Sequence, residues 1–291
     1  MRFNGSVQGL SIVSDTGTPA ALCEKVESGS LAIGQNIIEN FGIGNRRQTR
    51  WGTISAALDF TCTGMAKTTL AKWFPTAKGT QVADFPAASS GFLVEADDGS
   101  NGIECLLHDC QPAGCTLTMD QGETAQLMAA CQVMSASPDS QAVYTDEPVY
   151  TGYSGHTIND CTAQIDSADA GVLSFSLSNG LGVVMSNPMN TKASGVKRLP
   201  GGYYINAFAP EFSFDTEEDY NFADLFDDDT PAGVDITLAF ANGTGAEDFT
   251  ITLDSWIPSE WNMPLEPLGL VGFRHVWRPA SGTIFNRVQI A

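Results

Sequence analysis

The stretch ISAALDF, from Ile54 to Phe60, decides the fold, because the order of elements around it occurs twice in the chain. This strand-like segment leads to an apolar cluster at Leu70 to Phe74. In the second half INAFAPEFSF, from Ile205 to Phe214, leads to a similar cluster at Phe222 to Phe226. A repeat of whole elements at a fixed order predicts two units with one fold.

The segments that follow continue the repeat. Phe60 and Phe212 are 152 positions apart, and Val133 and Val276 are 143 positions apart. The spacing changes only in expected loops, which tolerate insertions better than packed strands do. The chain therefore divides at residues 1–140 and 141–291. The other matched segments are Phe92 to Asp98 with Val234 to Ala241, Ile103 to Asp109 with Phe249 to Asp254, and Gln126 to Ala136 with Leu270 to Ala280.

Composition and net charge limit the classes of fold and function that the protein can belong to. The 291 residues are 43% apolar and 16% charged, with 29 glycines and 14 prolines, which is typical of a β protein with many turns. The net charge of −20 argues against a protein that grips nucleic-acid phosphates. An acidic surface is instead suited to letting DNA slide past. The sequence shows no signal peptide and no membrane span, so we expect folding in the cytosol.

Seven cysteines, an odd number without paired spacing, predict reduced and mostly buried thiols. Strand alternation places Cys105 and Leu107 on one face. It places His108 and Cys110 on the other. The best zinc candidate, made of these thiols, His108 and Cys115, therefore has its ligands on opposite faces, and no metal is expected.

No motif predicts catalysis: the sequence lacks a nucleophile elbow and a phosphate loop, and neither a catalytic residue nor a cofactor is expected. Two acidic runs, Asp215 to Asp219 and Asp224 to Asp229, have two interpretations. They are a solvated surface or ligands for calcium, and the absence of EF-hand spacing favours the solvated surface. A calcium-dependent hydrolase stays open as an alternative.

Basic residues are scarce and clustered in two loops that the repeat places at matching positions. Such loops are either solvated hairpin tips or contacts to acidic surfaces of neighbouring copies, where charge sets orientation and register. The candidate contact residues are Arg46, Arg47 and Arg50 in the first loop, and Lys192, Lys197 and Arg198 in the second.

Each unit thus has strand, long basic loop, strand, short helix, strand, tight turn and strand, and in this order it resembles the phage tail tube proteins. The resemblance is carried by Leu31 to Asn36, Ile54 to Phe60 and Thr69 to Phe74. The matching segments of the second half are Val172 to Asn179, Ile205 to Phe214 and Tyr220 to Phe226. It implies a mainly β protein with two tandem β-sandwich or half-barrel units, each with one short helix. The implied helix core residues are Leu70, Trp73, Phe74, Phe222, Leu225 and Phe226.

In that family the sheets of neighbouring units join edge to edge into a ring, and the rings stack. A ring closes every open strand edge. Six units normally make the ring, so a duplicated chain implies three copies with pseudo-sixfold symmetry, and an unduplicated one implies a hexamer. The two basic loops become candidate inter-ring contacts. Residues 1–23 open the first unit as an extra segment: an arm, a strand or a contact to the adjacent ring.

The resemblance implies a structural virion protein, the major tail tube subunit, assembled in the host cytoplasm. Its implied partners are itself, tail terminator, distal tail and tape-measure proteins, and DNA that passes without tight binding. It implies no enzyme and no membrane. The alternative is a two-domain β-sandwich adhesin or baseplate module that binds sugars through exposed aromatics. The aromatic candidates are Trp256, Trp261, Tyr203 and Tyr204.

Overall fold

In the computed structural model the described residues are mainly β-strand, and the predicted mainly β class is confirmed. The structure describes residues 7–13, 20–21, 23–41, 47–65, 67–74, 90–97, 102–139, 155–186, 202–216, 233–241, 248–263, 272–280 and 288–290.

The elements fall on either side of the expected division at residue 140, which no described strand crosses. The first half holds β1 (Val7–Val13), β2 (Ala20–Ala21), β3 (Cys23–Phe41), β4 (Arg47–Met65), α1 (Lys67–Leu70), β5 (Ser90–Asp97), β6 (Gly102–Met119) and β7 (Gln126–Asp139). The second holds η2 (Ile158–Asp160), β8 (Cys161–Ile165), β9 (Ala168–Ala170), β10 (Val172–Ser178), β11 (Leu181–Ser186), β12 (Gly202–Phe208), β13 (Glu211–Thr216), β14 (Val234–Phe240), β15 (Phe249–Asn262), β16 (Phe273–Pro279) and β17 (Val288–Ile290).

Both halves pair their strands in the same order. The first runs β2-β1-β5-β6-β7-β4-β3, and the second runs β9-β8-β14-β15-β16-β13-β10, with every pair antiparallel. The described strands before Cys23, β1 and β2, therefore form an antiparallel pair with β1 beside β5, and β8 and β9 form the matching pair with β8 beside β14.

Irregularities in the ladders recur at matching places. The β3–β4 register shifts just before Ser28, and the β10–β13 register shifts just before Ser174, which is 146 positions later. The β6–β7 register shifts after Pro112 and the β15–β16 register after Pro258, again 146 positions later. A bulge inserts a residue and bends its strand, so its position is a specific feature of a sheet. Two further shifts recur, from Gln35/Ile37 to Gly182/Val183 and from Ser90/Phe92 to Val234/Ile236.

The ladders revise the register of the repeat. Leu58 pairs with Cys131 in the first half, and Phe212 pairs with Trp277 in the second. Since Cys131 and Trp277 are 146 positions apart, Leu58 corresponds to Phe212 at a spacing of 154. The expected spacings of 143 and 152 differ from these ladder spacings by three and two residues.

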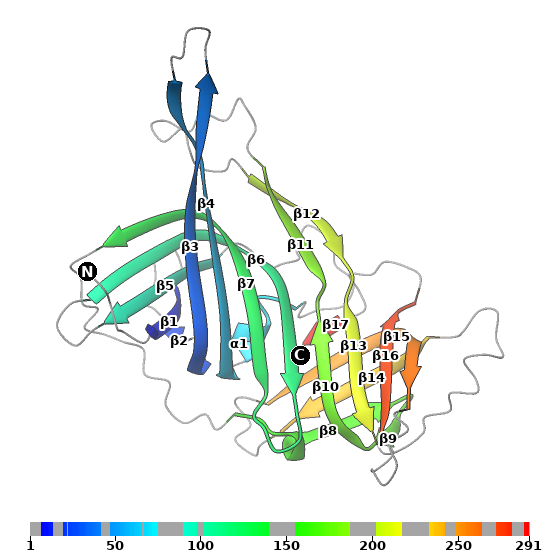
Figure 1. Cartoon of the computed structure of the whole chain (residues 1–291). Helices are drawn as coiled ribbons and strands as arrows, with labels where there is room; N and C mark the ends of the chain where they lie inside the picture. The colour runs from blue at the N-terminus through cyan, green and yellow to red at the C-terminus, as the bar shows by residue number, and fades with distance from the viewer. Residues whose placement is uncertain are drawn as a thin grey trace.

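One sheet continues through both halves. The end of β6 pairs with β10, with Leu117 opposite Leu177 and Met119 opposite Phe175. Figure 1 shows β6 and β10 side by side, with the two hairpins β3–β4 and β11–β12 extending beyond the sheet in the same direction.

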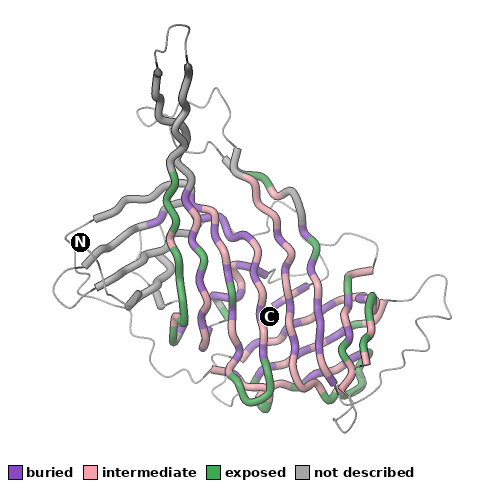
Figure 2. Tube along the Cα trace, viewed as in Figure 1, coloured by how far each residue is buried: buried purple, intermediate pink, exposed green. Residues whose placement is uncertain are grey.

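Among the described residues, one large hydrophobic cluster spans both halves, and a small second cluster of Leu181 and Phe208 lies on β11 and β12. Buried side chains alternate with half-buried ones along the strands (Figure 2), as expected when one face of a sheet is packed. One continuous cluster joins Leu58 and Leu117 of the first half to Phe212 and Ile251 of the second. The division at residue 140 thus separates strands but not cores.

Candidate functional site

The sheet that links the halves has two different faces. On β10, Phe175 and Leu177 are buried, while Ser174, Ser176 and Ser178 lie half-buried on the opposite face. The same alternation holds on the neighbouring strands of this sheet. Its polar face carries Ser28, Ser30, Thr61, Thr63, Thr116, Thr118, Gln126, Gln132, Ser174, Ser176, Ser178 and Ser213.

The polar face is hollowed across β3, β4, β6, β7 and β10. A hollow of about 540 Å³ is lined by Ser30, Asp59, Thr116 and Ser178, among others. Met128, 44% exposed, is the large apolar side chain at its wall. The small hydroxyl groups leave a smooth concave surface.

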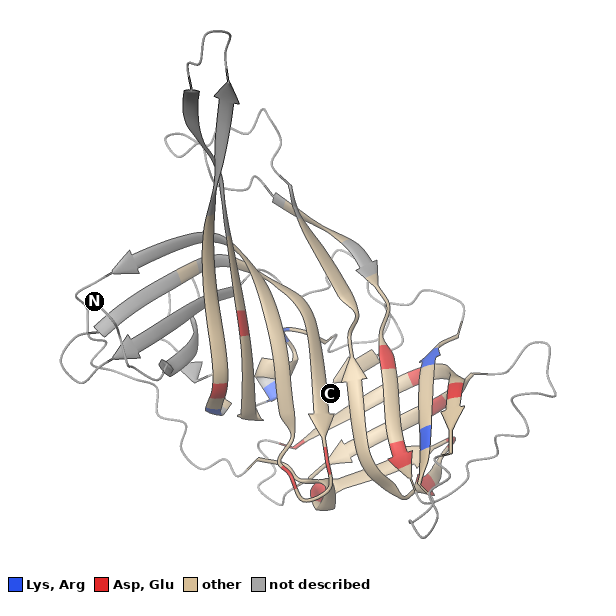
Figure 3. Ribbon diagram, viewed as in Figure 1, with Lys and Arg blue, Asp and Glu red and all other residues tan. Residues whose placement is uncertain are grey.

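Charges on this face are few in the described residues, and the cations have acidic neighbours. Lys25 lies 2.7 Å from Glu27, and Arg278 lies 2.8 Å from Glu211. Arg274 pairs across the ladder with Asp215, whose carboxylate also accepts a hydrogen bond of 2.7 Å from Ser174. Charged residues occupy only a minor part of this sheet in Figure 3. The face therefore presents no cluster of uncompensated cations.

Asn179 fastens the two halves together behind this face. Its Oδ1 accepts hydrogen bonds from the backbone N–H groups of Cys115 at 3.0 Å and Leu181 at 3.1 Å. Its Nδ2 donates to the carbonyl oxygen of Trp73 at 3.0 Å. The side chain is fully buried, so all its polar partners are protein atoms of β6, β11 and the turn after α1.

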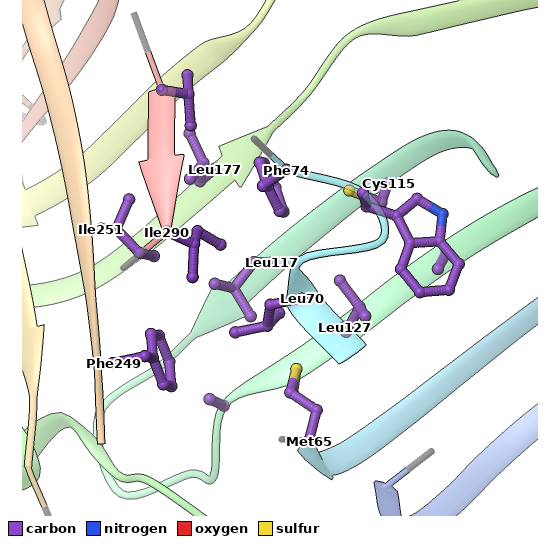
Figure 4. Close-up of a cluster of buried hydrophobic side chains, with 14 of the residues drawn as sticks. Met65, Leu70, Phe74, Cys115, Leu117, Leu127, Leu177, Phe249, Ile251 and Ile290 are labelled. Carbon is purple, nitrogen blue, oxygen red and sulfur yellow. The ribbon is translucent and has the colours of Figure 1, made fainter. Parts of the chain in front are cut away.

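The turn after α1 lies inside this joint. The expected helix residues Leu70, Trp73 and Phe74 are buried, and Trp73 donates its indole N–H to the carbonyl oxygen of Ala130 at 3.1 Å. Figure 4 shows Leu70 and Leu117 in one cluster with Phe249, Ile251 and Ile290 of the second half. Their expected counterparts Phe222, Leu225 and Phe226 lie outside the described residues.

The outer edge of β3 ends the sheet. Among the described strands β3 pairs with β4, whereas β10 pairs with both β13 and β6. Ile33 on β3 is 51% exposed and Leu31 is half-buried. At the matching positions, 146 residues later, Asn179 and Leu177 are fully buried. The edge strand β3 therefore exposes apolar surface, whereas the equivalent surface of β10 is covered by β6.

The candidate basic residues are only partly described. Arg47 and Arg50 belong to β4, at the far end of the β3–β4 hairpin, and pair with Phe41 and Ile38. They are thus strand residues and not loop residues as expected. Arg46, Lys192, Lys197 and Arg198 lie outside the described residues.

Cys110 and Cys115 of β6 are core residues. Leu107 and Cys110 are both fully buried, so the predicted simple alternation is wrong here. The reason is a register shift opposite β5, where Leu107 pairs with Phe92 and Cys110 pairs with Ser90. The described cysteines are free thiols; burial raises the pKa of Cys115 and Cys131 well above its ordinary value. Among the described residues no group of His, Cys, Asp and Glu has the arrangement of a metal site.

The aromatic candidates divide into two classes. Trp256 is fully buried, and Trp261 is half-buried and stacks on Phe273 with ring centroids 5.7 Å apart. Tyr203 and Tyr204 on β12 are 40% and 54% exposed.

Sequence reasoning missed Asn179 as a joint residue and Ile33 as an exposed residue at the edge of β3. The polar face had a visible signal, the alternation Ser-Phe-Ser-Leu-Ser from Ser174 to Ser178. Asn179 had none, because its role depends on two carbonyl and amide partners far away in the sequence.

Comparison with known proteins finds no matching protein-family model and no matching curated protein. In the part of the chain that the structure describes, no helix has the length and apolar character needed to cross a bilayer. Geometry therefore carries the functional argument.

Proposed function

We propose that the protein is a structural virion protein, the major tail tube subunit of a phage, and not an enzyme. One observation carries the proposal: a single sheet with a polar and an apolar face runs through both halves and ends at an exposed apolar edge. An open edge of this kind is a template for pairing with another chain.

The chain consists, in this proposal, of two tandem tube units. The identical strand order and the bulges that recur at a spacing of 146 support the duplication. Three copies then make a ring with pseudo-sixfold symmetry, because each chain supplies two of six equivalent units. Stacked rings form the tube, and tail terminator, distal tail and tape-measure proteins are its expected partners.

The polar face lines the channel. DNA retention by a protein needs cations for the phosphates or aromatic platforms for the bases. The described polar face offers small hydroxyl and amide groups, and Lys25 and Arg278 each have an acidic partner within 4 Å. Such a wall lets DNA pass without tight binding, as the net charge of −20 also favours.

The hairpins β3–β4 and β11–β12 make the contacts between rings. Both extend beyond the sheet in the same direction, so both reach the same neighbour (Figure 1). Their expected contact residues are Arg46, Arg47, Arg50, Lys192, Lys197 and Arg198.

Negative-stain electron microscopy over a concentration series, paired with mass in solution, tests the proposal. Rings or tubes built of chain trimers are expected. A chain that stays monomeric at every concentration, also in the presence of seeds taken from any assembled material, contradicts it. Reversing Arg46, Arg47 and Arg50 to Glu should leave rings intact and prevent their stacking.

A second candidate function is an adhesin or baseplate binding module. The exposed Tyr203 and Tyr204 on β12 favour it, since an exposed aromatic ring can stack on a sugar, and as consecutive strand residues the two rings lie on opposite faces of β12. A glycan array separates the two functions: binding that is lost in a Tyr203→Ala, Tyr204→Ala chain supports the adhesin.

A further inference from the structure

We propose that the joint between two copies of the chain reproduces the β6–β10 joint inside it. In this joint, β3 of one copy pairs antiparallel with the end of β15 of the next. The inference rests on the proposed function, because it requires that copies associate edge to edge.

The register follows from the repeat. Both β3 to β10 and β6 to β15 have a spacing of 146, fixed by the bulges before Ser28 and Ser174 and after Pro112 and Pro258. Within the chain Ser178 pairs with Thr116, and Leu177 pairs with Leu117. Subtracting 146 from the β10 residues and adding 146 to the β6 residues gives the pairs between copies. These are Ala32 with Asn262 and Leu31 with Met263.

The partial exposure of two apolar side chains shows that the edge of β3 lacks a covering strand among the described residues. Leu31 pairs with Leu58 and Ile33 with Ala56, so both lie on the apolar face of the sheet. Ile33 is nevertheless 51% exposed, whereas the residue at its matching position, Asn179, is fully buried against β6. A second copy that brings β15 to this edge covers Leu31 and Ile33 as β6 covers β10.

Proline at position 264 does not obstruct the pairing. Cys115 directs both its N–H and its carbonyl at Asn179, so Cys115, Leu117 and Met119 face β10 with their backbone groups. Thr118, which corresponds to Pro264, directs its groups away from β10. A residue without an N–H therefore costs this joint no hydrogen bond.

The two joints differ at one position. Asn179 bonds two backbone groups across the joint inside the chain, those of Cys115 and Trp73, and a third, the N–H of Leu181, in its own half. In the proposed joint between copies Ile33 takes the place of Asn179. An aliphatic side chain supplies apolar contact but no hydrogen bond. The joint inside the chain therefore has side-chain hydrogen bonds that the joint between copies lacks.

Disulfide cross-linking tests the register. Since alternate residues face the partner, Ser178 and Thr116 form a non-hydrogen-bonded pair, where Cα atoms approach to about 4.5 Å, within the range of a disulfide. An Ala32→Cys, Asn262→Cys chain should form bonds between copies under mild oxidation. The two positions lie on strands that β4, β7, β6, β10, β13 and β16 separate. Both are exposed in the single chain.

Two controls accompany the test. Thr116→Cys, Ser178→Cys should form the same bond within one chain and shows that the geometry permits it. Ala32→Cys, Glu260→Cys shifts the register by two residues on the same face and should give at least tenfold less cross-linking.

The outcomes separate the two proposals. Covalent dimers and trimers from the first pair alone support the joint. Rings in the microscope without this cross-link, or with equal cross-linking of the shifted pair, overturn the joint and leave the tube subunit in place. A chain that stays monomeric overturns both.

Discussion

The side-chain amide of Asn179 donates a hydrogen bond to the carbonyl oxygen of Trp73 at 3.0 Å across 106 residues of chain. The same amide accepts from Cys115 and Leu181, so one buried side chain bonds the turn after α1, the end of β6 and the start of β11. These hydrogen bonds are buried, so water does not take the place of the Asn179 amide as a partner of the three backbone groups.

Asn179→Ala should lower the free energy of unfolding by about 3 kcal/mol, because it leaves buried N–H and carbonyl groups unpaired. Urea denaturation measures the loss. Asn159→Ala, the same change at an exposed position, serves as the control. Equal stability of the two variants would contradict the role of the amide.

Gly180→Ala should destabilise the chain by at least about 2 kcal/mol. Gly180 has a positive φ of 55°, and an added Cβ would clash with the carbonyl oxygen of Ala209. Thermal unfolding monitored by circular dichroism checks the effect. At Gly272 nothing lies within 4 Å of an added Cβ, so Gly272→Ala should unfold at the temperature of the unchanged chain.

Alkaline pH should destabilise the fold partly through Cys161. Burial raises the pKa of Cys161 to about 12 from its ordinary value of 9.0. The unfolded chain therefore loses this proton first, and the stability that the neutral thiol contributes is complete below pH 9 and is lost as pH rises towards 12. Between pH 8 and pH 10.5 the urea midpoint of unfolding should fall less in Cys161→Ala than in the unchanged chain. An equal fall in the two chains would exclude this contribution.

Ile33→Asp should raise the protein concentration needed for assembly at least tenfold, because it places a charge on the apolar edge of β3. The side chain is 51% exposed, so the melting temperature of the single chain should change little. Analytical ultracentrifugation over a concentration series measures the shift. Met128→Asp introduces the same charge at an exposed apolar side chain of the polar face and should assemble normally.

A basic polar face should retain DNA. In a chain with Thr61→Arg, Gln126→Arg and Gln132→Arg, added cations line β4 and β7, and affinity for DNA should fall steeply with salt because phosphate contacts release counterions. Fluorescence anisotropy with a labelled duplex measures binding to the assembled protein. The same three positions changed to Glu, like the unchanged chain, should show no binding at 0.15 M salt. Tight binding by the unchanged assembly would contradict a passive channel.

The sequence predicted which segments are strands better than how they align. ISAALDF lies in β4 and INAFAPEFSF spans β12 and β13, as predicted for strand segments, because apolar periodicity and turn residues mark a strand locally. Their register was wrong, since Phe60 corresponds to Phe214 and not to Phe212 when the ladders are followed. Bulges such as the one after Pro112 change which residues face the core, and nothing in the local pattern reveals them.

The residues at the joint could not be predicted from the sequence for a different reason. The segments Leu31 to Asn36 and Val172 to Asn179, matched from the sequence, end on Asn36 and Asn179, but the bulge positions align Asn179 with Ile33. Asn179 bonds backbone groups that are distant in the sequence, whereas Ile33 is exposed at the edge of β3. The same position on the strand thus has two different environments. Only the pairing of β10 with β6, and of β3 with β4 alone among the described strands, distinguishes them.

The last strand has a consequence for the timing of folding. β17 pairs with β15, and its Val288 and Ile290 are buried in the core that both halves share. The ribosome must therefore release these residues before the core can close. A nascent chain that still holds residues 288–290 inside the ribosome is thus unable to present a finished sheet edge to its neighbours, and polymerisation follows the release of these residues.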